Sequence, residues 1–397
     1  MKKNDWHTYL MRDVLERVEV PVNVEPDKEY VQIGIRSHGK GLFYKEPVLG
    51  KALGNKQVFW IQPNCFVLNV VFAWEQAITK TTENEIGMIG SHRFPMYRPK
   101  NDLVDIDYLV YYFLTKRGTD ILKAASPGGA GRNRTLGQER FLKSKITLPP
   151  LPEQQKIAVI LSTQDKVIEL KEKLLAQKQQ QKKYLMQQLL TGKKRLPGFG
   201  GEWKTIHLNE ISCRIETKNT VGNNNVLTIS AQYGLINQTE FFDKVIASDD
   251  KSNYYLLSKD EFAYNRSYSK GYPYGTIKRL KRYVQGVVSP LYICFAVNKK
   301  LASLDFLEQY FEASIINREI QSIVQEGARN HGMLNVAVDD FFRIKITMPE
   351  IEEQKEIVEI LSTADHEIDL LQESIESEKQ KKKALMQLLL TGKVRVK

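Results

Sequence analysis

The sequence has few of the residues and runs that mark several common classes of protein. Its three cysteines, Cys65, Cys213 and Cys294, lie far apart without metal-ligand spacing, so we expect reduced structural thiols and no zinc site. No run of about 18 apolar residues occurs, and the N-terminal segment lacks the apolar core of a signal peptide. We therefore expect no membrane span and a cytoplasmic location.

Catalytic signatures are missing as well. Residues 34–41, GIRSHGKG, nearly spell a phosphate-binding loop, but Gly41 stands where Ser or Thr must hold magnesium, and no helical pattern follows. GFGGEW, at residues 198–203, follows no strand, which argues against a nucleotide site. There is no Asn/Asp-Pro-Pro-aromatic motif of the kind that holds a flipped base, and the six histidines are scattered. We therefore expect no catalytic, cofactor-binding or metal-binding residues in this chain.

Positive charge, in contrast, is abundant. Lysine and arginine number 58 against 47 acidic residues, which gives a formal net charge of +11. Such an excess suits a polyanionic partner, because each neutralised phosphate releases counterions. Many soluble proteins are also mildly basic, so charge alone leaves nucleic-acid binding open. The 397 residues suffice for two or three domains, and the hydrophobic fraction of 42% is typical of a folded protein.

The strongest signal is an internal duplication. The phrase FLKSKITLPPLPEQQKIAVILSTQDKVIEL, from Phe141, aligns without a gap with FFRIKITMPEIEEQKEIVEILSTADHEIDL, from Phe341. Further on, KKYLMQQLLTGKKR matches KKALMQLLLTGKVR, and about half of the positions in the whole stretch are identical. Outside it the halves match weakly, as Trp6 and Trp203 do. We therefore expect one plan used twice with pseudo-twofold symmetry: a divergent globular part and then a similar helical repeat.

The duplication sets the predicted domain boundaries. The globular parts are expected at residues 1–148 and 201–346, and the helical repeats at residues 149–200 and 347–397. Aromatic and β-branched runs, such as QVFWIQPNCFVLNVVFAW from Gln57, predict strands in the globular parts. Helical stretches such as DFLEQYFEASIINREIQSIV, from Asp305, accompany them. The fold class that we expect is α+β.

Each repeat predicts one long helix. Prolines at 149, 150 and 152 suit its start, and Gly192 and Gly392 suit its C-terminal stop. Apolar residues at steps of three and four, interrupted by polar residues at Gln164, Lys171, Lys178 and Lys182 in the first copy and at Glu378 and Lys382 in the second, form a coiled-coil seam. The apolar seam residues are Ile157, Leu161, Ile168, Leu175, Leu185 and Leu189 in the first copy and Ile357, Leu361, Ile368, Leu371, Ile375, Leu385 and Leu389 in the second. Some 38 residues give a helix of about 57 Å. We expect the two helices to pair as an antiparallel coiled coil with the globular parts at opposite ends. The alternative is that each helix packs on its own globular part.

The densest candidate for DNA contact is YNRSYSKGYPYGTIKRLKRY, residues 264–283. It contains six basic residues and five tyrosines but no acid. Basic groups contact phosphates, and arginine can also read guanine edges. The alternative is a solvated hairpin whose tyrosines pack on one face. In the first half, basic residues cluster around His38, around Pro95 and in SPGGAGRNR, which matches EGARNHG of the second half in placement.

The candidate DNA-binding residues are therefore these cations: Arg36, Lys40, Arg93, Arg98, Arg132, Arg134, Arg266, Lys270, Lys278, Arg279, Lys281, Arg282 and Arg329. His38, His92, Tyr97, Lys100, Asn133, Asn330 and His331 accompany them.

The duplicated phrases KITLPPLPEQQKIAVILS and KITMPEIEEQKEIVEILS, each followed by a helix ending in Leu-Leu-Thr-Gly-Lys, resemble the specificity subunits of type I restriction-modification systems. The resemblance covers the chain from end to end. It implies two target recognition domains, each reading half of an asymmetric, interrupted site in double-stranded DNA. It also implies two methyltransferase (modification) subunits that hold S-adenosylmethionine and methylate adenine, and restriction subunits that translocate and cleave.

A physical argument agrees with this resemblance. A bipartite site needs two different readers on a spacer of fixed length, and half-sites one duplex turn apart lie about 34 Å from each other. The alternative is a duplicated nucleic-acid-binding scaffold without a methyltransferase partner. A chain that is itself the methyltransferase is disfavoured by the missing motifs.

Overall fold

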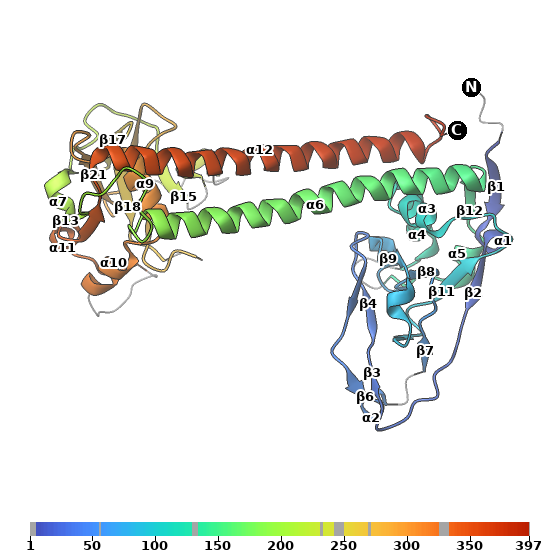
Figure 1. Ribbon diagram of the computed structural model, residues 1–397. Helices are drawn as coiled ribbons and strands as arrows, with labels where there is room; N and C mark the ends of the chain where they lie inside the picture. The colour runs from blue at the N-terminus through green and yellow to red at the C-terminus, as the bar shows by residue number, and fades with distance from the viewer. Residues whose placement is uncertain are drawn as a thin grey trace. The chain divides into compact units, whose positions relative to one another are not determined.

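The computed structural model of the chain describes residues 5–54, 57–128, 134–230, 233–241, 250–268, 271–324 and 333–396. The chain forms two compact units. Unit 1 consists of residues 1–172 and 373–397, and unit 2 consists of residues 173–372. The two long helices, α6 (Leu151–Leu189) and α12 (Ile351–Leu389), each contribute to both units (Figure 1). Unit 1 therefore holds the start of α6 and the end of α12, and unit 2 holds the end of α6 and the start of α12.

The centre of unit 1 is a four-stranded antiparallel sheet in the order β2-β11-β8-β9. These strands are β2 (Leu15–Val18), β11 (Met96–Pro99), β8 (Phe66–Leu68) and β9 (Ile78–Lys80). Helices α3 (Ile106–Phe113), α4 (Lys116–Ala125) and α5 (Gln138–Leu142) accompany the sheet, and β1 (His7–Leu10) pairs with β12 (Lys145–Leu148). The smaller two-stranded pairs are β3 (Glu29–Tyr30) with β6 (Val48–Leu49), β4 (Ile33–Ile35) with β5 (Leu42–Tyr44), and β7 (Val58–Trp60) with β10 (Ile89–Ser91). Short helices α1 (Met11–Val14) and α2 (Gly50–Leu53) complete the unit.

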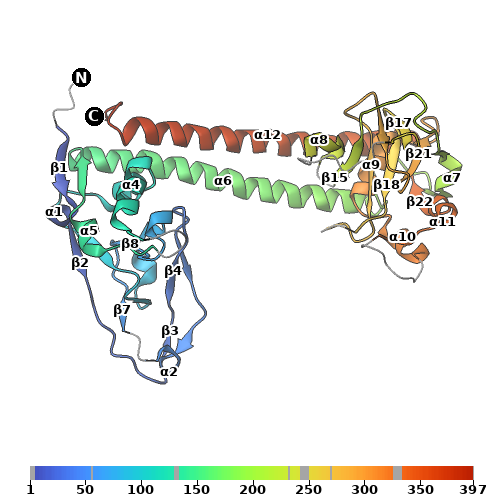
Figure 2. The same cartoon turned by 180° about the vertical axis from the view of Figure 1, so that it is seen from behind.

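Unit 2 repeats this plan (Figure 2). Its four-stranded sheet has the order β14-β21-β18-β19, with β14 (Ser212–Ile215), β21 (Ile293–Val297), β18 (Phe262–Asn265) and β19 (Thr276–Arg279). The two-stranded pairs are β13 (Lys204–His207) with β22 (Lys345–Met348), β15 (Leu227–Ser230) with β16 (Gly234–Asn237), and β17 (Tyr255–Ser258) with β20 (Gln285–Val288). The helices are α7 (Leu208–Ile211), α8 (Gln238–Phe241), α9 (Leu304–Glu312), α10 (Asn317–Ile323) and α11 (Val338–Phe342).

Matching hydrogen bonds make the equivalence of the two units explicit. Gln154, near the start of α6, accepts a hydrogen bond from the backbone N–H of the residue that caps α3, and Gln354 does the same for the cap of α9. Both glutamines also donate to a proline carbonyl five residues earlier. The same side chain thus ties each repeat to its own globular part. The α+β class and the internal duplication are confirmed.

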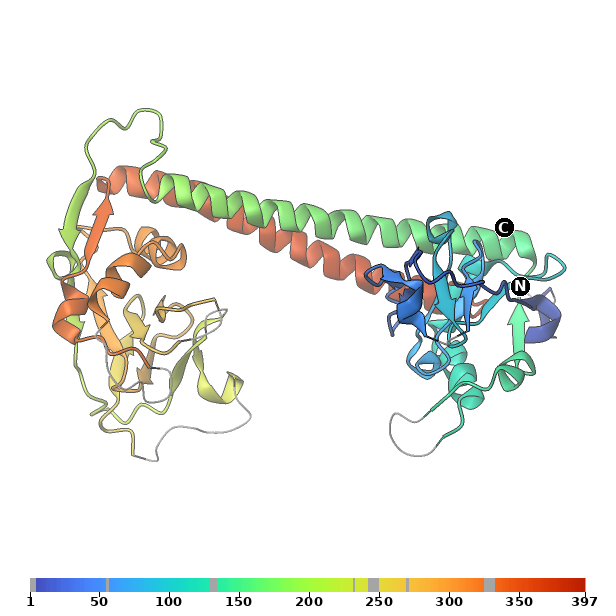
Figure 3. The same cartoon turned by 90° about the horizontal axis from the view of Figure 1, so that it is seen from below.

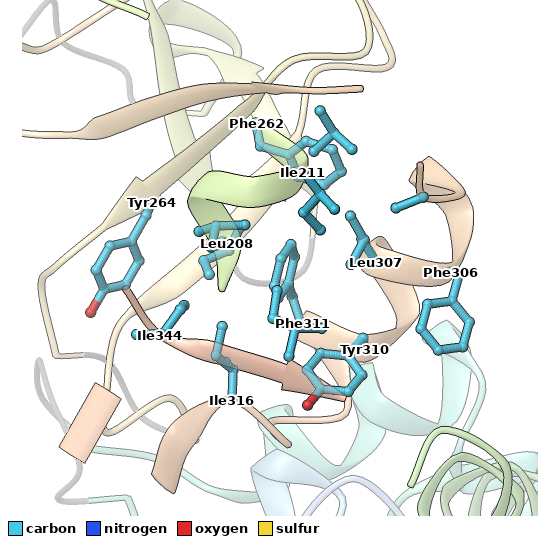
Figure 4. Close-up of a cluster of buried hydrophobic side chains, with 14 of the residues drawn as sticks. Leu208, Ile211, Phe262, Tyr264, Phe306, Leu307, Tyr310, Phe311, Ile316 and Ile344 are labelled. Atoms are coloured by element: carbon cyan, nitrogen blue, oxygen red, sulfur yellow. The ribbon is translucent and has the colours of Figure 1, made fainter. Parts of the chain in front are cut away.

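Aromatic side chains fill both cores. In unit 1 the rings of Phe66 and Phe113 lie 5.3 Å apart between centroids. In unit 2 the corresponding rings, Phe262 and Phe311, lie 5.9 Å apart in an edge-to-face arrangement. Figure 4 shows this second core, to which α7, β18 and α9 contribute. Since truncating a buried phenylalanine to alanine costs about 3–5 kcal/mol, these clusters account for much of each unit's stability.

The two long helices run antiparallel within each unit. In unit 1 Lys171 of α6 pairs with Glu378 of α12 at 2.8 Å, and Asp165 pairs with Lys382 at 2.5 Å, so residue numbers fall along α12 as they rise along α6. In unit 2 Lys182 pairs with Asp365. The Asp165–Lys382 and Asp365–Lys182 pairs are the same interaction made twice, 200 residues apart. The predicted antiparallel coiled coil is confirmed.

The seam residues lie against both the partner helix and the globular cores. Nine are buried: Ile157, Leu161, Ile168, Leu189, Ile357, Leu361, Ile368, Ile375 and Leu389. Four are half-buried: Leu175, Leu185, Leu371 and Leu385. The residues toward the helix ends belong to globular cores, Leu161 and Leu389 to that of unit 1, and Leu189 and Leu361 to that of unit 2. The predicted alternative, in which each helix packs on a globular part, therefore applies to the ends of the helices.

The C-terminal end of each helical repeat packs against a tryptophan near the start of a globular part: the first repeat against that of unit 2, and the second repeat against that of unit 1. Gly192, after α6, has φ +69° and lies against the ring of Trp203. Gly392, after α12, has the same φ and lies against the ring of Trp6. Arg395, which follows Gly392, contacts Asp5 at 3.8 Å, so the two ends of the described chain lie close together within unit 1 (Figure 3).

Candidate DNA interface

The loop between β8 and β9, residues 69–77, organises one face of unit 1. The β4–β5 turn is fastened to it, because the backbone N–H groups of His38 and Gly39 donate to the carbonyls of Glu75 and Gln76 at 2.8 and 2.9 Å. His38 and Gln76 both have positive φ, at 62° and 61°. Such left-handed residues cost free energy, so the surrounding hydrogen bonds must hold them. The loop therefore fixes the turn that carries Arg36, His38 and Lys40.

The same loop gathers two further predicted stretches. The N–H of Val70 donates to the carbonyl of Arg93 at 3.0 Å, and the N–H of Leu136 donates to the carbonyl of Val70 at 2.8 Å. The guanidinium of Arg134 lies 5.5 Å from the ring centroid of Trp74. Three separate stretches of sequence thus meet around one loop. We name residues 36–40, 69–77, 91–93 and 134–136 the loop face.

The cations of the loop face differ in whether they already make contacts within the protein. Lys40 and Arg93 are exposed and have no acidic partner among the described residues. The Arg36 guanidinium lies 5.1 Å from the centroid of the Phe43 ring and also donates to the Leu42 carbonyl. Lys40 and Arg93 are therefore the side chains best placed to meet a phosphate, since binding a phosphate breaks no existing ion pair.

Arg98 is committed elsewhere. It lies on β11 and forms an ion pair with Glu16 on the neighbouring strand β2. Its neighbour Tyr97 is fully buried and donates to Gln138. Of this group His92 and Lys100 are exposed. The structure therefore gives Tyr97 a core role and places Arg98 in a cross-strand pair.

In unit 2 the described part of the basic run, residues 264–268 and 271–283, contains the end of β18 and all of β19, and acidic residues of α9 contact several of its cations. Arg279 has a side chain only 7% exposed and contacts Asp305 at 2.5 Å and Glu308 at 2.9 Å. Lys278 pairs with Glu312, and Lys281 contacts Glu308 at 3.2 Å. Arg279 is thus a buried cation held by two carboxylates, and Lys278 already has one acidic partner. This structure therefore favours contacts within the fold for both side chains, and their contact with phosphates stays a prediction.

Unit 1 contains the equivalent of the Arg279 pair. Lys80, at the end of β9, contacts Asp107 of α3 at 2.7 Å. Lys80 faces Phe66 across its strand pair as Arg279 faces Phe262, so the two cations occupy matching positions. A contact made in both copies belongs to the shared frame. This is the physical reason for assigning Arg279 a structural role.

Arg266 also serves the fold. Its guanidinium donates to the carbonyls of Leu291 and Val336 at 3.0 Å, which ties the segment before α11 to the sheet. Arg282 is exposed and pairs with Glu240 at 3.1 Å. Tyr264 is fully buried, whereas Tyr268 is 64% exposed. For most of the described part of this run, the structure thus agrees better with the alternative of a hairpin with packed tyrosines than with a DNA-binding surface.

Three predicted cations, Arg132, Lys270 and Arg329, lie outside the described residues, as do Asn133, Asn330 and His331. Trp74 could not be singled out from the sequence, because the apolar run that contains it predicts a continuous strand. Tyr233, which is 60% exposed beside β16, was not singled out either. Trp74 is half-buried beside Arg134, and aromatic rings next to cations are a common feature of nucleic-acid surfaces that sequence alone does not reveal.

The two buried cysteines, Cys65 and Cys294, are poor nucleophiles, because burial disfavours the thiolate form. Burial raises the pKa of the Cys65 thiol to about 11 and that of Cys294 to about 12. Cys213 is exposed, and all three thiols are free. Within the described ranges no group of three or more His, Cys, Asp or Glu residues could hold a metal ion. No helix in that part of the chain is both long and apolar enough to cross a membrane.

Comparison with known proteins identifies the family. The type I restriction modification DNA specificity domain matches residues 26–180 and 202–379, one match for each half of the chain. A type I restriction enzyme MjaVIII specificity subunit from Methanocaldococcus jannaschii is 28% identical over 75% of this chain and 72% of its own length. A putative MjaX specificity subunit from the same organism is 24% identical over 76% and 71%.

Solved structures show the same fold. The HsdS subunit from Thermoanaerobacter tengcongensis aligns with a TM-score of 0.58 at 17% identity, over 99% of this chain and 98% of that one. The type I restriction-modification S subunit from M. genitalium aligns with a TM-score of 0.54 at 13% identity, over 98% of both chains. The chain therefore belongs to the type I restriction modification DNA specificity family, whose members supply DNA sequence recognition to a type I restriction-modification complex.

Proposed function

We propose that each globular part reads one half of a bipartite, asymmetric DNA site. Residues 1–148 form target recognition domain 1 and residues 201–346 form target recognition domain 2, with helical repeats at 149–200 and 347–397. The observation that carries the proposal is a shared frame with divergent surfaces. Strand order and repeat contacts agree between the units, whereas the charges around the β8–β9 and β18–β19 hairpins do not. Two different readers on one frame suit an asymmetric site.

The helical repeats would set the unread spacer and dock two methyltransferase subunits. Helix α6 is continuous over 39 residues. At 1.5 Å per residue this is about 58 Å, which exceeds the roughly 34 Å between half-sites one duplex turn apart. Repeats that make matching contacts 200 residues apart offer two similar surfaces, and such surfaces suit two identical partners.

The chemistry would reside in the partners. The specificity family is non-catalytic. We propose that the modification subunits bind S-adenosylmethionine and methylate adenine in the site that this chain selects, and that restriction subunits translocate and cleave DNA. Such a complex would work in the cytoplasm. Family membership disfavours the alternative of a scaffold without a methyltransferase partner.

A domain exchange tests the proposal. Residues 203–340 are replaced by the equivalent part of a related subunit, and methylated adenines are mapped across the host genome. One half of the recognised site should change while the other half and the spacer stay the same. The matched control exchanges residues 7–140 and should alter only the opposite half. Changes in both half-sites after either exchange would contradict independent reading.

The spacer is tested separately. Inserting one heptad after Lys178 keeps the seam register and adds about 10 Å of helix, which corresponds to about three base pairs of rise. Because only one helix of the pair is lengthened, we expect the spacer to grow by roughly one to three base pairs with both half-sites unchanged. An unchanged spacer with an altered half-site would show that the helices do not set the distance.

A further inference from the structure

Two ion pairs between the long helices differ from the contacts that the duplication repeats. In unit 1 Lys171 of α6 contacts Glu378 of α12 at 2.8 Å, and in unit 2 Lys178 of α6 contacts Glu367 of α12 at 2.7 Å. The duplication makes Lys178 and Glu378 equivalent, 200 residues apart, yet their charges are opposite. We name these four residues, two lysines on α6 and two glutamates on α12, the selector charges.

The repeated contacts of the helix pair do not distinguish one repeat from the other. The pair of Asp165 with Lys382 in unit 1 recurs as the pair of Asp365 with Lys182 in unit 2. Because each repeat carries both members, this contact would also form between two copies of α6 or two copies of α12. The apolar seam is likewise present in both repeats. These features alone would let a helix pair with the like helix of a second chain.

Pairing α6 with the α6 of a second copy would bring cations together. The contact between residues 171 and 378 would become a contact between Lys171 and the Lys178 of the second copy. The twofold symmetry of such a pair would form this contact twice. Lys178 would also lose its carboxylate, because Val167 stands on α6 where Glu367 stands on α12. Facing charges of like sign disfavour a helix pair, whereas opposite charges favour it.

Pairing α12 with the α12 of a second copy would bring carboxylates together. The contact between residues 178 and 367 would become a contact between Glu378 and the Glu367 of the second copy, again twice. Leu371 stands on α12 where Lys171 stands on α6, so Glu378 would lose its lysine as well. The Glu378 side chain is only 19% exposed, so water would replace that lysine incompletely. The pair of α6 with α12 therefore suits the selector charges best.

A buried hydrogen bond adds to this preference. The amide nitrogen of Gln164 donates to the Glu378 carboxylate at 2.7 Å, and Gln164 is only 5% exposed. Ala364 stands at the equivalent position of α12 and has no group that could donate. A pair of two α12 helices would thus lack this bond too, and a buried acceptor without a donor costs free energy.

We propose that the selector charges make the two repeats of one chain pair with each other and reject the like repeat of a second copy. The partner that α6 accepts is defined by charge, because it must present glutamates to Lys171 and Lys178. The consequence for DNA rests on the proposed function: two like repeats would bring two copies of one globular part together, and such a pair would read a symmetric site. The selector charges thereby keep the recognised site asymmetric.

A full chain that is cut after folding tests the proposal. A protease site is placed between Gly200 and Gly201, which are exposed and where an added Cβ would meet nothing within 4 Å. The folded chain is cleaved, unfolded in urea and refolded by dilution, and native mass spectrometry identifies the pairs by mass. Fragment 1–200 should pair with fragment 201–397, and pairs of like fragments should be rare.

A charge exchange, Lys178→Glu with Glu378→Lys, should invert this preference. Lys171 would then face a glutamate in a pair of two α6 helices, and Glu367 would face a lysine in a pair of two α12 helices. Both contacts of the unlike pair would become repulsive. The ratio of unlike to like pairs should therefore fall by at least roughly tenfold.

The matched control makes the same two substitutions at exposed positions, Lys183→Glu with Glu373→Lys, so its composition equals that of the charge exchange. Its fragments should pair as those of the unchanged chain do. Random proportions of unlike and like pairs from the unchanged chain, or a preference that survives the charge exchange, would overturn the proposal. The same inversion in the control, or fragments that do not pair at all, would overturn it as well.

The outcome is separable from that of the proposed function, because pairing is measured without DNA or partner subunits. Adenine methylation is mapped in parallel for the complex of the uncut, unchanged chain. If that complex methylates no defined bipartite site, the proposed function fails whatever the fragments do. If it does and the charge exchange leaves unlike pairs dominant, the proposal on the selector charges alone fails.

Discussion

The hairpins β8–β9 and β18–β19 occupy the same place in the two units, yet their cations make different ion pairs. Both carry one cation that reaches the following helix, Lys80 to Asp107 and Arg279 to Asp305. Within the described ranges, further ion pairs with acids, Glu308 and Glu312, are seen for the second hairpin. Most cations of its dense positive run therefore make contacts inside the fold, whereas Lys40 and Arg93, near the β8–β9 loop of unit 1, have no acidic partner among the described residues. Density of charge in a sequence does not identify the surface that binds DNA.

Arg279→Ala is expected to have the largest effect. Removing this buried cation takes away the partner of Asp305 and leaves Glu308 with Lys281 alone, and we expect the free energy of unfolding to fall by about 2–3 kcal/mol. Lys80→Ala should cost less, about 0.5–1 kcal/mol, because its pair is more exposed. Urea denaturation measures both. If Arg279→Ala left stability intact but flattened the salt dependence of DNA binding, Arg279 would be a reader after all.

The second test removes the free cations of the loop face. In the assembled complex, Lys40→Ala with Arg93→Ala should weaken DNA binding roughly tenfold and reduce the log–log salt slope by roughly two, one for each lost phosphate contact. Lys278→Ala serves as the control, because Glu312 already neutralises Lys278, and its slope should match that of the unchanged complex. Equal slopes for all three proteins would show that DNA lies elsewhere.

A third test compares the ends of the two repeats. Gly192→Ala and Gly392→Ala each place a methyl group on a residue with positive φ and against a tryptophan ring. Both should lower the free energy of unfolding by about 1–2 kcal/mol. Since the geometry is the same in both units, the two losses should agree within about 0.5 kcal/mol. A large difference, measured by urea denaturation, would mean that only one repeat end is structurally important.

The smallest expected effect concerns acid. Hydrogen bonds from Lys171 and then Gln164 hold the pKa of Glu378 at about 2, below its ordinary value near 4.5. This contribution to stability is present above pH 4.5 and is lost as the pH falls from about 4.5 to about 2. Hydrogen exchange over residues 373–389 should therefore accelerate in this window, and Glu378→Gln should remove the dependence. Glu367→Gln, in unit 2, is the control; an identical response to it would exclude Glu378 as the cause.

The sequence predicted the frame far better than the candidate site. The duplicated phrases specify each helix, its proline start and its glycine stop, because these are local features repeated at a fixed offset. The seam also predicted antiparallel pairing. The fate of Arg279 could not be predicted in this way, since Asp305 and Glu308 follow it by 26 and 29 residues and only folding brings them together. The role of the β8–β9 loop could not be predicted either, because it depends on backbone hydrogen bonds between residues far apart in the sequence, and these bonds do not depend on residue type.

Each globular part begins and ends on one two-stranded ribbon. The Thr8 and Thr147 hydroxyls lie 3.0 Å apart across β1 and β12, and those of Thr205 and Thr347 lie 2.9 Å apart across β13 and β22. Because the first and last strands of each globular part pair with each other, we expect a globular part of another length or sequence to fit without shifting the helices. The coding sequence for KITLP or KITMP stands at that junction. We expect a crossover in the coding sequence of KITLP to replace residues 1–148 with those of a related chain, while the ion pairs between α6 and α12 are kept.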